Sequence, residues 1–468
     1  MMSGSSGSIE TQLTTAERAG ADQAAEAHEA AVAPRLPLRH RVMRSSFWTG
    51  LEYGVGQALR FGGHLVLAYL LVPRMFGLMA VVNVCIQGLE MLSDVGLAPS
   101  IIQSERGVER RFLNTAWTLQ ILRGIVLWTL ACVLAWPMAA LYNERLIFLL
   151  PVAALSVVLR GFTSTKWYTQ NRALLLGRRT MITIGSKAAM IGLMILWAWY
   201  TPTVWALVGG AVIGAGLEMI GSHLVLPGAT NRVELDRSSL HEIYRFGRWI
   251  AISTALAFGA RHIETLMFGK LFGATALGVF WVALQIARVG PEFMQRLGQY
   301  VGFPALAELY RQDFAQFRRR LLHLRVITVV PLNLAMLTLI GFGPMLIELI
   351  YPNAYHNASW MLAAMATTSL AGMVNDGYGN AYLAMGRSFN LMLMIAAQIT
   401  MTVICTLIGY TQAGSVGFLV GSAFAHWFVY PINAAIADRV GIWQPELDLP
   451  VLAGSGVTGF YLLFMWLG

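Results

Sequence analysis

Charged side chains are scarce in this 468-residue chain. Asp, Glu, Lys and Arg together make up 12% of the residues, about half the share that is usual in soluble domains, and apolar residues make up 56%. The chain has 46 glycines, which are small residues that let helices approach one another closely in lipid. The composition therefore predicts an all-α integral membrane protein.

Cysteine and the sequence motifs of common enzyme classes are also rare or missing. The three cysteines, Cys85, Cys132 and Cys405, lie in apolar stretches, so we expect neither disulfides nor a metal site. No glycine-rich phosphate loop ends in Gly-Lys-Ser or Gly-Lys-Thr, and the nine histidines form no HExxH motif. These absences argue against an ATPase or a metalloenzyme. We expect no cofactor, and a transporter rather than an enzyme.

Long polar loops are missing as well. Thirteen apolar segments follow one another with short connections, and each is long enough to cross about 30 Å of hydrocarbon as a helix. The predicted spans are 44–72, 74–97, 112–136, 145–165, 180–200, 203–227, 247–269, 274–303, 326–350, 358–385, 389–410, 413–436 and 450–467. Residues 1–41 lack the apolar core of a signal peptide, so we expect them to form a disordered cytoplasmic tail.

Basic residues are nearly absent from every second connection. With a cytoplasmic N-terminus, the cytoplasmic segments carry 22 Lys and Arg residues, and the outer loops carry three, namely Arg74, Arg145 and Lys270. The positive-inside rule then predicts a multi-pass protein of the inner membrane with its N-terminus in the cytoplasm. Because the net charge of +9 is spread over these segments, it does not indicate a nucleic-acid partner.

A weak internal repeat divides the spans into two halves. At an offset of 201 residues the identities are Arg60 with Arg261, Leu65 with Leu266, Leu70 with Leu271, Gly77 with Gly278 and Val81 with Val282. Six spans per half is an even number, so both halves insert in the same orientation, with a ligand site between them. We predict an N-lobe at 42–227, a cytoplasmic linker at 228–246, a C-lobe at 247–437 and a C-terminal segment at 438–468 that contains the thirteenth span.

Two amphipathic stretches are expected on the cytoplasmic side. In the linker, Ser239 and Glu242 have the spacing of a capping box, which predicts a helix that continues into the seventh span. Residues 305–321 alternate aromatic and aliphatic residues with arginines, which favours a single helix lying on anionic lipid.

Ionisable residues inside the spans are the candidate functional groups, because each costs at least a few kcal/mol to place in a bilayer. The basic candidates for a ligand-facing role are Arg60, Arg261, Arg123, Arg160, Lys187 and Arg288. The acidic candidates for ion coupling or ion pairing are Glu264, Glu292 and Asp376. A simpler interpretation is pairing along one helix face, for which the spacing of Arg261 with Glu264 and of Arg288 with Glu292 is suitable.

Mid-membrane arginines favour an anionic cargo. The guanidinium group is planar and forms paired hydrogen bonds, so it suits phosphate. Arg60 has no acid three or four residues away, so its partner must lie on another helix, in water or on a ligand. We expect Arg60 and Arg261 to approach a central cavity from opposite lobes.

Two stretches also carry the motifs of a known family. The first begins at Leu71 and runs LVPRMFGLMAVVNVCIQGLEMLSDVGLAPSIIQ, with Phe76-Gly77-Leu78 before the second span and Asp94-Val95-Gly96-Leu97 leading to Ile101-Ile102-Gln103. The second is the linker VELDRSSLHEIYRFGRWI. Together they resemble the polysaccharide-transport flippases of the multidrug/oligosaccharidyl-lipid/polysaccharide exporter superfamily. The resemblance covers residues 42–440, and the thirteenth span departs from the family's usual twelve or fourteen.

The resemblance implies two six-helix lobes around a central cavity that opens alternately to either side. It implies a cargo as well: an oligosaccharide repeat unit linked through diphosphate to a polyprenol, flipped to the outer leaflet for exopolysaccharide, capsule or O-antigen synthesis. Membrane lipid and the polymerase and export machinery would be further partners. A cation-coupled multidrug antiporter of the same superfamily is one alternative. A membrane glycosyltransferase or polymerase is another, which the short outer loops disfavour.

Overall fold

The structure is a computed structural model that describes residues 38–93, 101, 106–107, 109–173 and 175–467, and every regular element in these ranges is a helix. The helices are α2 (Leu38–Leu70), α3 (Pro73–Leu92), α5 (Arg110–Leu141), α6 (Leu146–Gly161), α7 (Lys166–Arg172), α8 (Leu176–Tyr200), α9 (Val204–Leu224), α10 (Arg237–Ala287), α11 (Val289–Leu297), α12 (Phe303–Gln312), α13 (Phe314–Ile350), α14 (Ala358–Asp376), α15 (Gly379–Ala384), α16 (Ser388–Arg439) and α17 (Pro445–Leu467), with a π-helical turn η1 (Gly298–Gly302) and a 3-10 turn η2 (Asn353–Tyr355). Most of the expected tail and the Asp94-Val95-Gly96-Leu97 motif lie outside the described residues.

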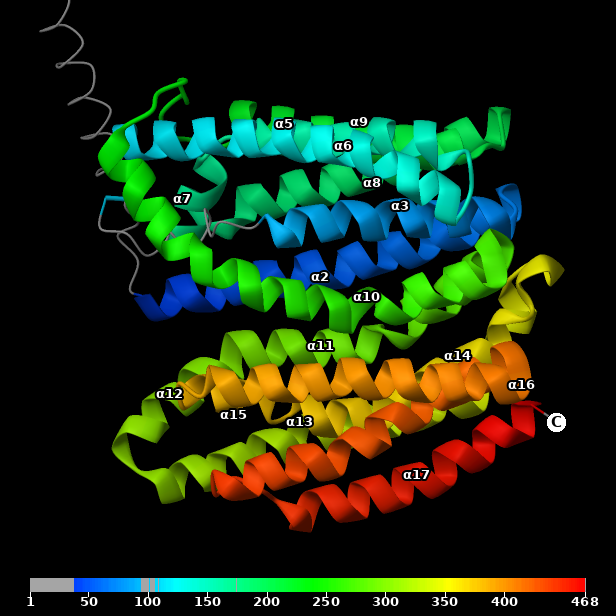
Figure 1. Ribbon diagram of the computed structural model, residues 1–468. Helices are drawn as coiled ribbons and strands as arrows, with labels where there is room; N and C mark the ends of the chain where they lie inside the picture. Colours follow the sequence, from blue (N-terminus) through cyan, green and yellow to red (C-terminus); the bar gives the residue numbers. More distant parts are fainter. Residues whose placement is uncertain (1–37, 94–100, 102–105, 108, 174, 468) are drawn as a thin grey trace, which may run out of the picture.

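The helices form two lobes, one above the other in Figure 1. The first contains α2, α3 and α5 to α9, and the second contains α10 to α17. Helix α10 is the part of the second lobe that faces the first. It packs against α3 on one side and against α14 and α16 on the other. The predicted all-helical, two-lobed fold is therefore confirmed.

Helices α10 and α16 are each folded back on themselves. Straight helices of 51 and 52 residues would be about 75 Å long, more than twice the thickness of a bilayer core. The backbone instead leaves the helical region at Gly273, with φ +79°, and at Gly414, with φ +58°. The rings of Phe268 and Phe280, on either side of Gly273, lie 4.5 Å apart. Each helix is therefore a hairpin of two arms. The arms of α16 and the first arm of α10 each match one predicted span, whereas the second arm of α10 covers the first half of the span predicted at 274–303, which continues through α11 and η1.

These hairpins reconcile the helix count with the thirteen predicted spans. By length and composition, eight helices in the described part of the chain qualify as spans, or nine when α6 and α7, which meet at 59°, are counted as one. Two of the eight, α10 and α16, supply two arms each. Helices α2, α6 and α14 run alongside the others in the bundle (Figure 1). Within the described ranges, these helices and arms together match the thirteen apolar segments of the sequence.

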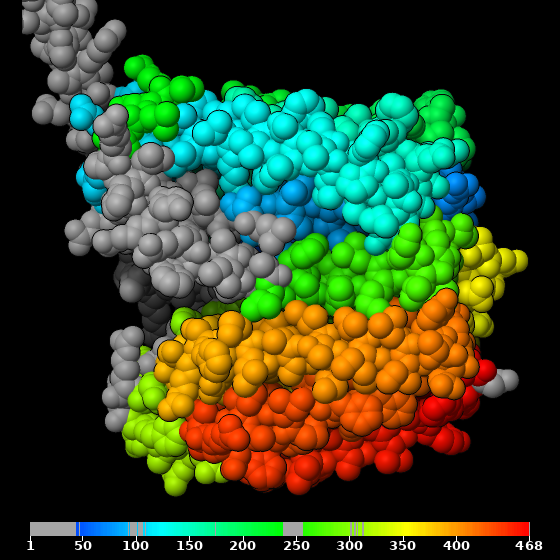
Figure 2. All heavy atoms as spheres, in the orientation of Figure 1, coloured from blue at the N-terminus to red at the C-terminus, as the bar shows by residue number. Residues whose placement is uncertain are grey.

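The lobes meet tightly at the end of the bundle opposite α7 and α12, which we call the closed end. In Figure 2 the atoms of α10 fill the space between the lobes there. A Cβ on Gly77 would overlap the carbonyl oxygen of Ala274, and a Cβ on Gly278 would overlap that of Pro73. Gly77 and Gly278 are 201 residues apart, and so are Pro73 and Ala274, so the repeat relates the first contact to the second. The contact therefore lies on an approximate two-fold axis between the lobes.

Side-chain hydrogen bonds between the lobes reinforce the closed end. Tyr355 donates to the carbonyl oxygen of Leu71 at 2.8 Å, Lys270 to that of Leu141 at 2.9 Å, and Tyr142 to that of Leu266 at 3.0 Å. The carbonyls of Leu71 and Leu141 lie at the ends of α2 and α5, where main-chain acceptors have no partner within the helix, so two of these bonds satisfy groups that would be costly to leave bare.

The structure has the helix predicted for the linker, but it does not have the single helix predicted for residues 305–321. Helix α10 begins at Arg237 and runs without a break into the seventh predicted span, although the side chains of Ser239 and Glu242 lie outside the described residues. The prediction of a single helix at 305–321 is wrong, because the backbone is extended at Asp313 and divides the stretch between α12 and α13. The Asp313 carboxylate caps α13 by accepting a hydrogen bond from the backbone N–H of Ala315 at 2.7 Å. The face expected on lipid is wrong in part, since Leu306 and Phe317 are buried in the protein.

Helix α17 is fastened to the second lobe by a buried ion pair. Arg325 of α13 contacts Asp448 of α17 at 2.6 Å, and the two side chains are 2% and 0% exposed. Tyr378 donates to the same carboxylate at 2.6 Å, and the Arg325 guanidinium lies 3.8 Å from the centre of its ring. The thirteenth helix is thus an integral part of this lobe.

Candidate functional site

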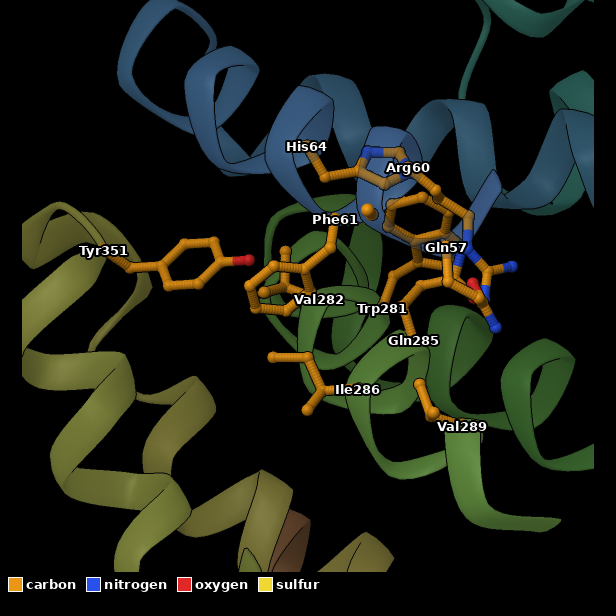
Figure 3. Close-up of a pocket in the computed structure, with 11 residues that line it drawn as sticks. Gln57, Arg60, Phe61, His64, Trp281, Val282, Gln285, Ile286, Val289 and Tyr351 are labelled. Atoms are coloured by element: carbon orange, nitrogen blue, oxygen red, sulfur yellow. The ribbon is translucent and has the colours of Figure 1, made fainter. Parts of the chain in front are cut away.

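The second arm of α10 and helix α11 separate two cavities in the middle of the bundle. The smaller cavity, about 270 Å³, lies between α2 and this arm. Figure 3 shows Gln57, Arg60 and His64 reaching it from α2, and Trp281 and Gln285 from α10. Tyr351, which follows α13, turns its hydroxyl toward it from the other side (Figure 3). The smaller cavity is therefore bounded by both lobes.

Arg60 joins the two lobes through an ion pair. Its guanidinium lies 3.8 Å from the carboxylate of Glu292 on α11, and the two side chains are 34% and 23% exposed. At that distance and exposure the pair is loose and worth at most about 1 kcal/mol. A ligand that offers paired hydrogen bonds to Arg60 would therefore displace Glu292 at little cost.

The larger cavity, about 640 Å³, lies mostly within the second lobe and is also touched by Met91 of α3. Four predicted site residues line it besides Glu292, namely Arg261, Glu264, Arg288 and Asp376. Glu292 also lines this cavity, so the Arg60–Glu292 pair marks the boundary between the two cavities.

Arg261 and Arg288 lie beside each other on the wall of the larger cavity. Arg288 donates to the carbonyl oxygen of Arg261 at 2.7 Å, and Arg261 makes a long contact of 3.4 Å with Gln295. The pairs suggested by sequence spacing, Arg261 with Glu264 and Arg288 with Glu292, do not form ion pairs within the described residues. Glu292 is instead turned across the lobe interface.

Lys187 of α8 lies beside α2 in the first lobe and is not among the residues that line either cavity. A Cβ on Gly56 of α2 would lie 3.4 Å from its ammonium nitrogen, and Gly56 is one helical turn from Arg60. Within the described residues its side chain makes neither a hydrogen bond nor an ion pair. The first lobe therefore presents two cations, Arg60 and Lys187, on neighbouring parts of α2 and α8.

The remaining basic candidates are engaged elsewhere in the first lobe. Arg123 donates to the carbonyl oxygen of Glu90 at 2.6 Å and to Ser93 at 3.0 Å, which satisfies acceptors at the C-terminal end of α3. Arg160 pairs with the Glu90 carboxylate at 3.1 Å and is 55% exposed. Neither lines either of the two cavities.

Carboxylates and histidines complete the ionisable groups. Asp376 lines the larger cavity without an ion pair or a hydrogen bond within the described residues. The His64 ring packs edge-on against Trp281 at 4.8 Å, so it lies at the contact between α2 and α10. In the described part of the chain, His, Cys, Asp and Glu form no group of three able to hold a metal ion.

Several cavity residues escaped the sequence analysis because they are neutral. Gln57, Trp281, Gln299 and Asn380 carry no charge that would distinguish them in an apolar span. Arg325 directly precedes the span predicted at 326–350, so it looks like one more loop arginine, and its partner Asp448 is 123 residues away.

Comparison with known proteins places this architecture in a family. The family model described as polysaccharide biosynthesis protein matches residues 66–360, more than half of the chain. The chain belongs to this family. The lipopolysaccharide biosynthesis protein WzxC of Escherichia coli K12 is 22% identical over 449 residues, which cover 91% of this chain and 89% of WzxC. The teichuronic acid biosynthesis protein TuaB of Bacillus subtilis 168 is 22% identical over 316 residues, covering 64% and 62%.

Solved structures share the fold at low identity. The lipid II flippase MurJ, in an inward closed conformation, superposes with a TM-score of 0.63 at 12% identity, covering 90% of this chain and 92% of MurJ. An inward-facing multidrug resistance MATE family transporter of the MOP superfamily gives 0.60 at 14%, covering 82% and 96%. The chain is thus an integral membrane member of the polysaccharide biosynthesis protein family, with the same fold as these two transporters.

Proposed function

We propose that this protein is a flippase for a polyprenyl-diphosphate-linked oligosaccharide. It moves the repeat unit from the cytoplasmic to the outer leaflet of the inner membrane, for exopolysaccharide, capsule or O-antigen synthesis, by alternating access between the lobes. The α7 and α12 end of the bundle faces the cytoplasm, as the distribution of basic residues predicts. The names of WzxC, TuaB and MurJ support this cargo class.

The observation that carries the proposal is the convergence of cations from both lobes. Arg60 comes from the first lobe, and Arg261 and Arg288 come from the second. Lys187 stands outside the lining of both cavities, beside Gly56, which is one helical turn from Arg60. We propose that these four groups hold the diphosphate. In this proposal, the diphosphate replaces the Glu292 carboxylate as the partner of Arg60 when the cargo binds. Arg123 and Arg160 are left out of this assignment because their partners lie on α3.

The physics of the cargo agrees with such a site. Sugar hydroxyls and a diphosphate would lose their water in hydrocarbon, so the head group needs a polar path while the tail stays in lipid. Moving an anion outward across a membrane with a negative interior is favourable by about 2.3 kcal/mol per charge per 100 mV. The membrane potential therefore drives part of the step.

A cation-coupled multidrug antiporter is the second candidate. The uncompensated carboxylate of Asp376 in the larger cavity favours it, because an acid in a membrane interior attracts a proton or a cation. The same acid would serve an ion-coupled flippase. We favour the lipid-linked anion because cations outnumber acids where the two lobes meet, and because the family is one of polysaccharide biosynthesis.

Substitution of Arg60 tests the proposal. Arg60→Ala should abolish polymer export with the protein at normal abundance, because the lost Glu292 pair contributes little to folding. Arg60→Lys should recover part of the export, since an ammonium lacks the planar fork. Arg145→Ala, an exposed arginine beyond the cavities, is the matched control and should export normally. Normal export by a stable Arg60→Ala protein would refute the role in diphosphate binding.

The orientation has its own test. In intact cells a cysteine at Asn353 should react with an impermeant thiol reagent, whereas one at Arg178 should be shielded. The reverse pattern would overturn the proposed direction of transport.

A further inference from the structure

The wall of the larger cavity contains an irregular turn. Between α11 and α12 the chain forms the π-helical turn η1, Gly298–Gly302, and three of its residues, Gly298, Gln299 and Gly302, line the cavity. π-helical turns are rare and are often found at functional sites, because the wider turn redirects side chains and backbone groups. None of the ionisable candidates requires this geometry.

Glycine at the start of this turn makes room for an amide. A Cβ on Gly298 would overlap the side-chain nitrogen of Asn380, the second residue of α15. The absence of a side chain at Gly298 therefore lets the Asn380 amide lie directly against the turn. Gln299 and Asn380 both line the cavity, and their side chains make no hydrogen bond within the described residues.

An amide side chain both donates and accepts hydrogen bonds, as a sugar hydroxyl does. The cavity offers these amides among largely apolar neighbours such as Met294, Leu306 and Leu383. A volume of about 640 Å³ is within the range of small-molecule sites, where a few polar groups in an apolar lining determine which ligand is bound. Arg261 and Arg288 stand on the same wall, so a group bound there is joined to the proposed diphosphate site.

We propose that the larger cavity is the sugar-recognition subsite, in which Gln299 and Asn380 bind hydroxyls of the oligosaccharide. This inference rests on the proposed flippase function and extends it by separating two tasks. The cations between the lobes bind the diphosphate that every such cargo shares. The amides at η1 distinguish one glycan from another.

Binding to two probes separates the tasks. The probes are polyprenyl diphosphate without sugar, and the lipid-linked repeat unit extracted from the cells that make the polymer. Gln299→Ala and Asn380→Ala should each weaken binding of the glycosylated probe by about tenfold, the loss expected for one or two hydrogen bonds, and leave the bare probe unchanged. Arg60→Ala should weaken both. Thr338→Ala is the matched control and should bind both probes normally, since this exposed hydroxyl is bonded to the Leu334 carbonyl oxygen at 3.0 Å and lines neither cavity.

The outcomes distinguish this inference from the proposed function. If the unsubstituted protein binds neither probe, the proposed function fails. If Arg60→Ala weakens both probes while the two amide variants bind the glycosylated probe normally, the flippase stands and the sugar subsite is overturned. Equal weakening of both probes by Gln299→Ala and Asn380→Ala would also overturn it. Asn380→Leu and Gln299→Met, which remove the amide and keep most of the side-chain volume, should show the same selective loss if the alanine variants fail to fold.

Discussion

At the scale of single residues, two of the arginine–carboxylate pairs in the protein differ sharply in their surroundings. The Arg60–Glu292 pair is half-exposed, 3.8 Å long and open to ligand, whereas the Arg325–Asp448 pair is 2.6 Å long, dry and surrounded by Tyr378 and Gln444. A buried charge that loses its partner is costly, while an exposed pair contributes little. The first pair is therefore suited to exchange, and the second to permanent attachment.

Stability measurements should reveal this difference. Asp448→Ala strands the buried Arg325 guanidinium and should lower the free energy of unfolding by about 3–5 kcal/mol. Glu292→Gln should lower it by less than about 1 kcal/mol. Denaturant unfolding of both purified variants in the same detergent gives the comparison. Replacing both partners, Arg325→Met with Asp448→Leu, should restore much of the loss, and equal stability of Asp448→Ala and the unsubstituted protein would contradict the argument.

The same contrast explains which site residues could be found from sequence. Arg60, Arg261 and Arg288 stand out because arginine is rare in apolar spans. Their partners could not be found, since Glu292 turns to the other lobe rather than to Arg288 four residues before it. Helical spacing describes contacts along one helix, and these contacts join different helices.

At the scale of elements, apolar length was sufficient to predict the long helices of the bundle, eight or nine of which qualify as spans within the described residues, but turn chemistry was not visible. Asp313 looks like one more polar residue in a basic amphipathic stretch, yet its carboxylate ends α12 and starts α13. The hairpin turns at Gly273 and Gly414 are likewise hidden among many glycines, most of which are helical. A glycine in a turn and a glycine packed within a helix differ in their backbone angles, which the sequence does not show.

That backbone angle leads to a prediction for α10. Gly273 has φ +79° and ψ 176°, a region that residues with a side chain avoid, although no atom lies near its would-be Cβ. Gly273→Ala should therefore lower the free energy of unfolding by about 1–3 kcal/mol through backbone strain alone. The matched control is Gly54→Ala, a helical glycine with equally open surroundings, which should be neutral or stabilising by up to about 1 kcal/mol. Thermal unfolding in detergent measures both, and two shifts of the same sign would exclude strain at Gly273.

At the scale of the whole molecule, the weak sequence repeat acquires a physical meaning. An offset supported by five identities relates the two glycines through which the lobes touch at the closed end. Gly77 packs against the carbonyl oxygen of Ala274 in the second lobe, and Gly278 packs against the carbonyl oxygen of Pro73 in the first. Two copies of one contact, facing each other across an axis, provide a point about which similar lobes can rock.

The last prediction tests whether this contact holds the closed end shut. A valine at Gly77 would press on the Ala274 carbonyl, a backbone atom that cannot rotate away, so α3 and the second arm of α10 must separate. In a variant without Cys85, Cys132 and Cys405, a cysteine at Tyr351, which is 5% exposed near this end, should then react several times faster with a polar thiol reagent in detergent. Two-fold symmetry requires Gly278→Val to act in the same direction as Gly77→Val.

A matched control separates this effect from general loosening. Gly216 is also helical, but the nearest atom to its would-be Cβ is 3.8 Å away, so Gly216→Val should leave the reactivity of the cysteine unchanged. If Gly77→Val stays folded with the cysteine still shielded, the contact does not keep the end closed. If the Gly77 and Gly278 variants act in opposite directions, the lobes do not share an axis at this point, and rocking about it would be excluded.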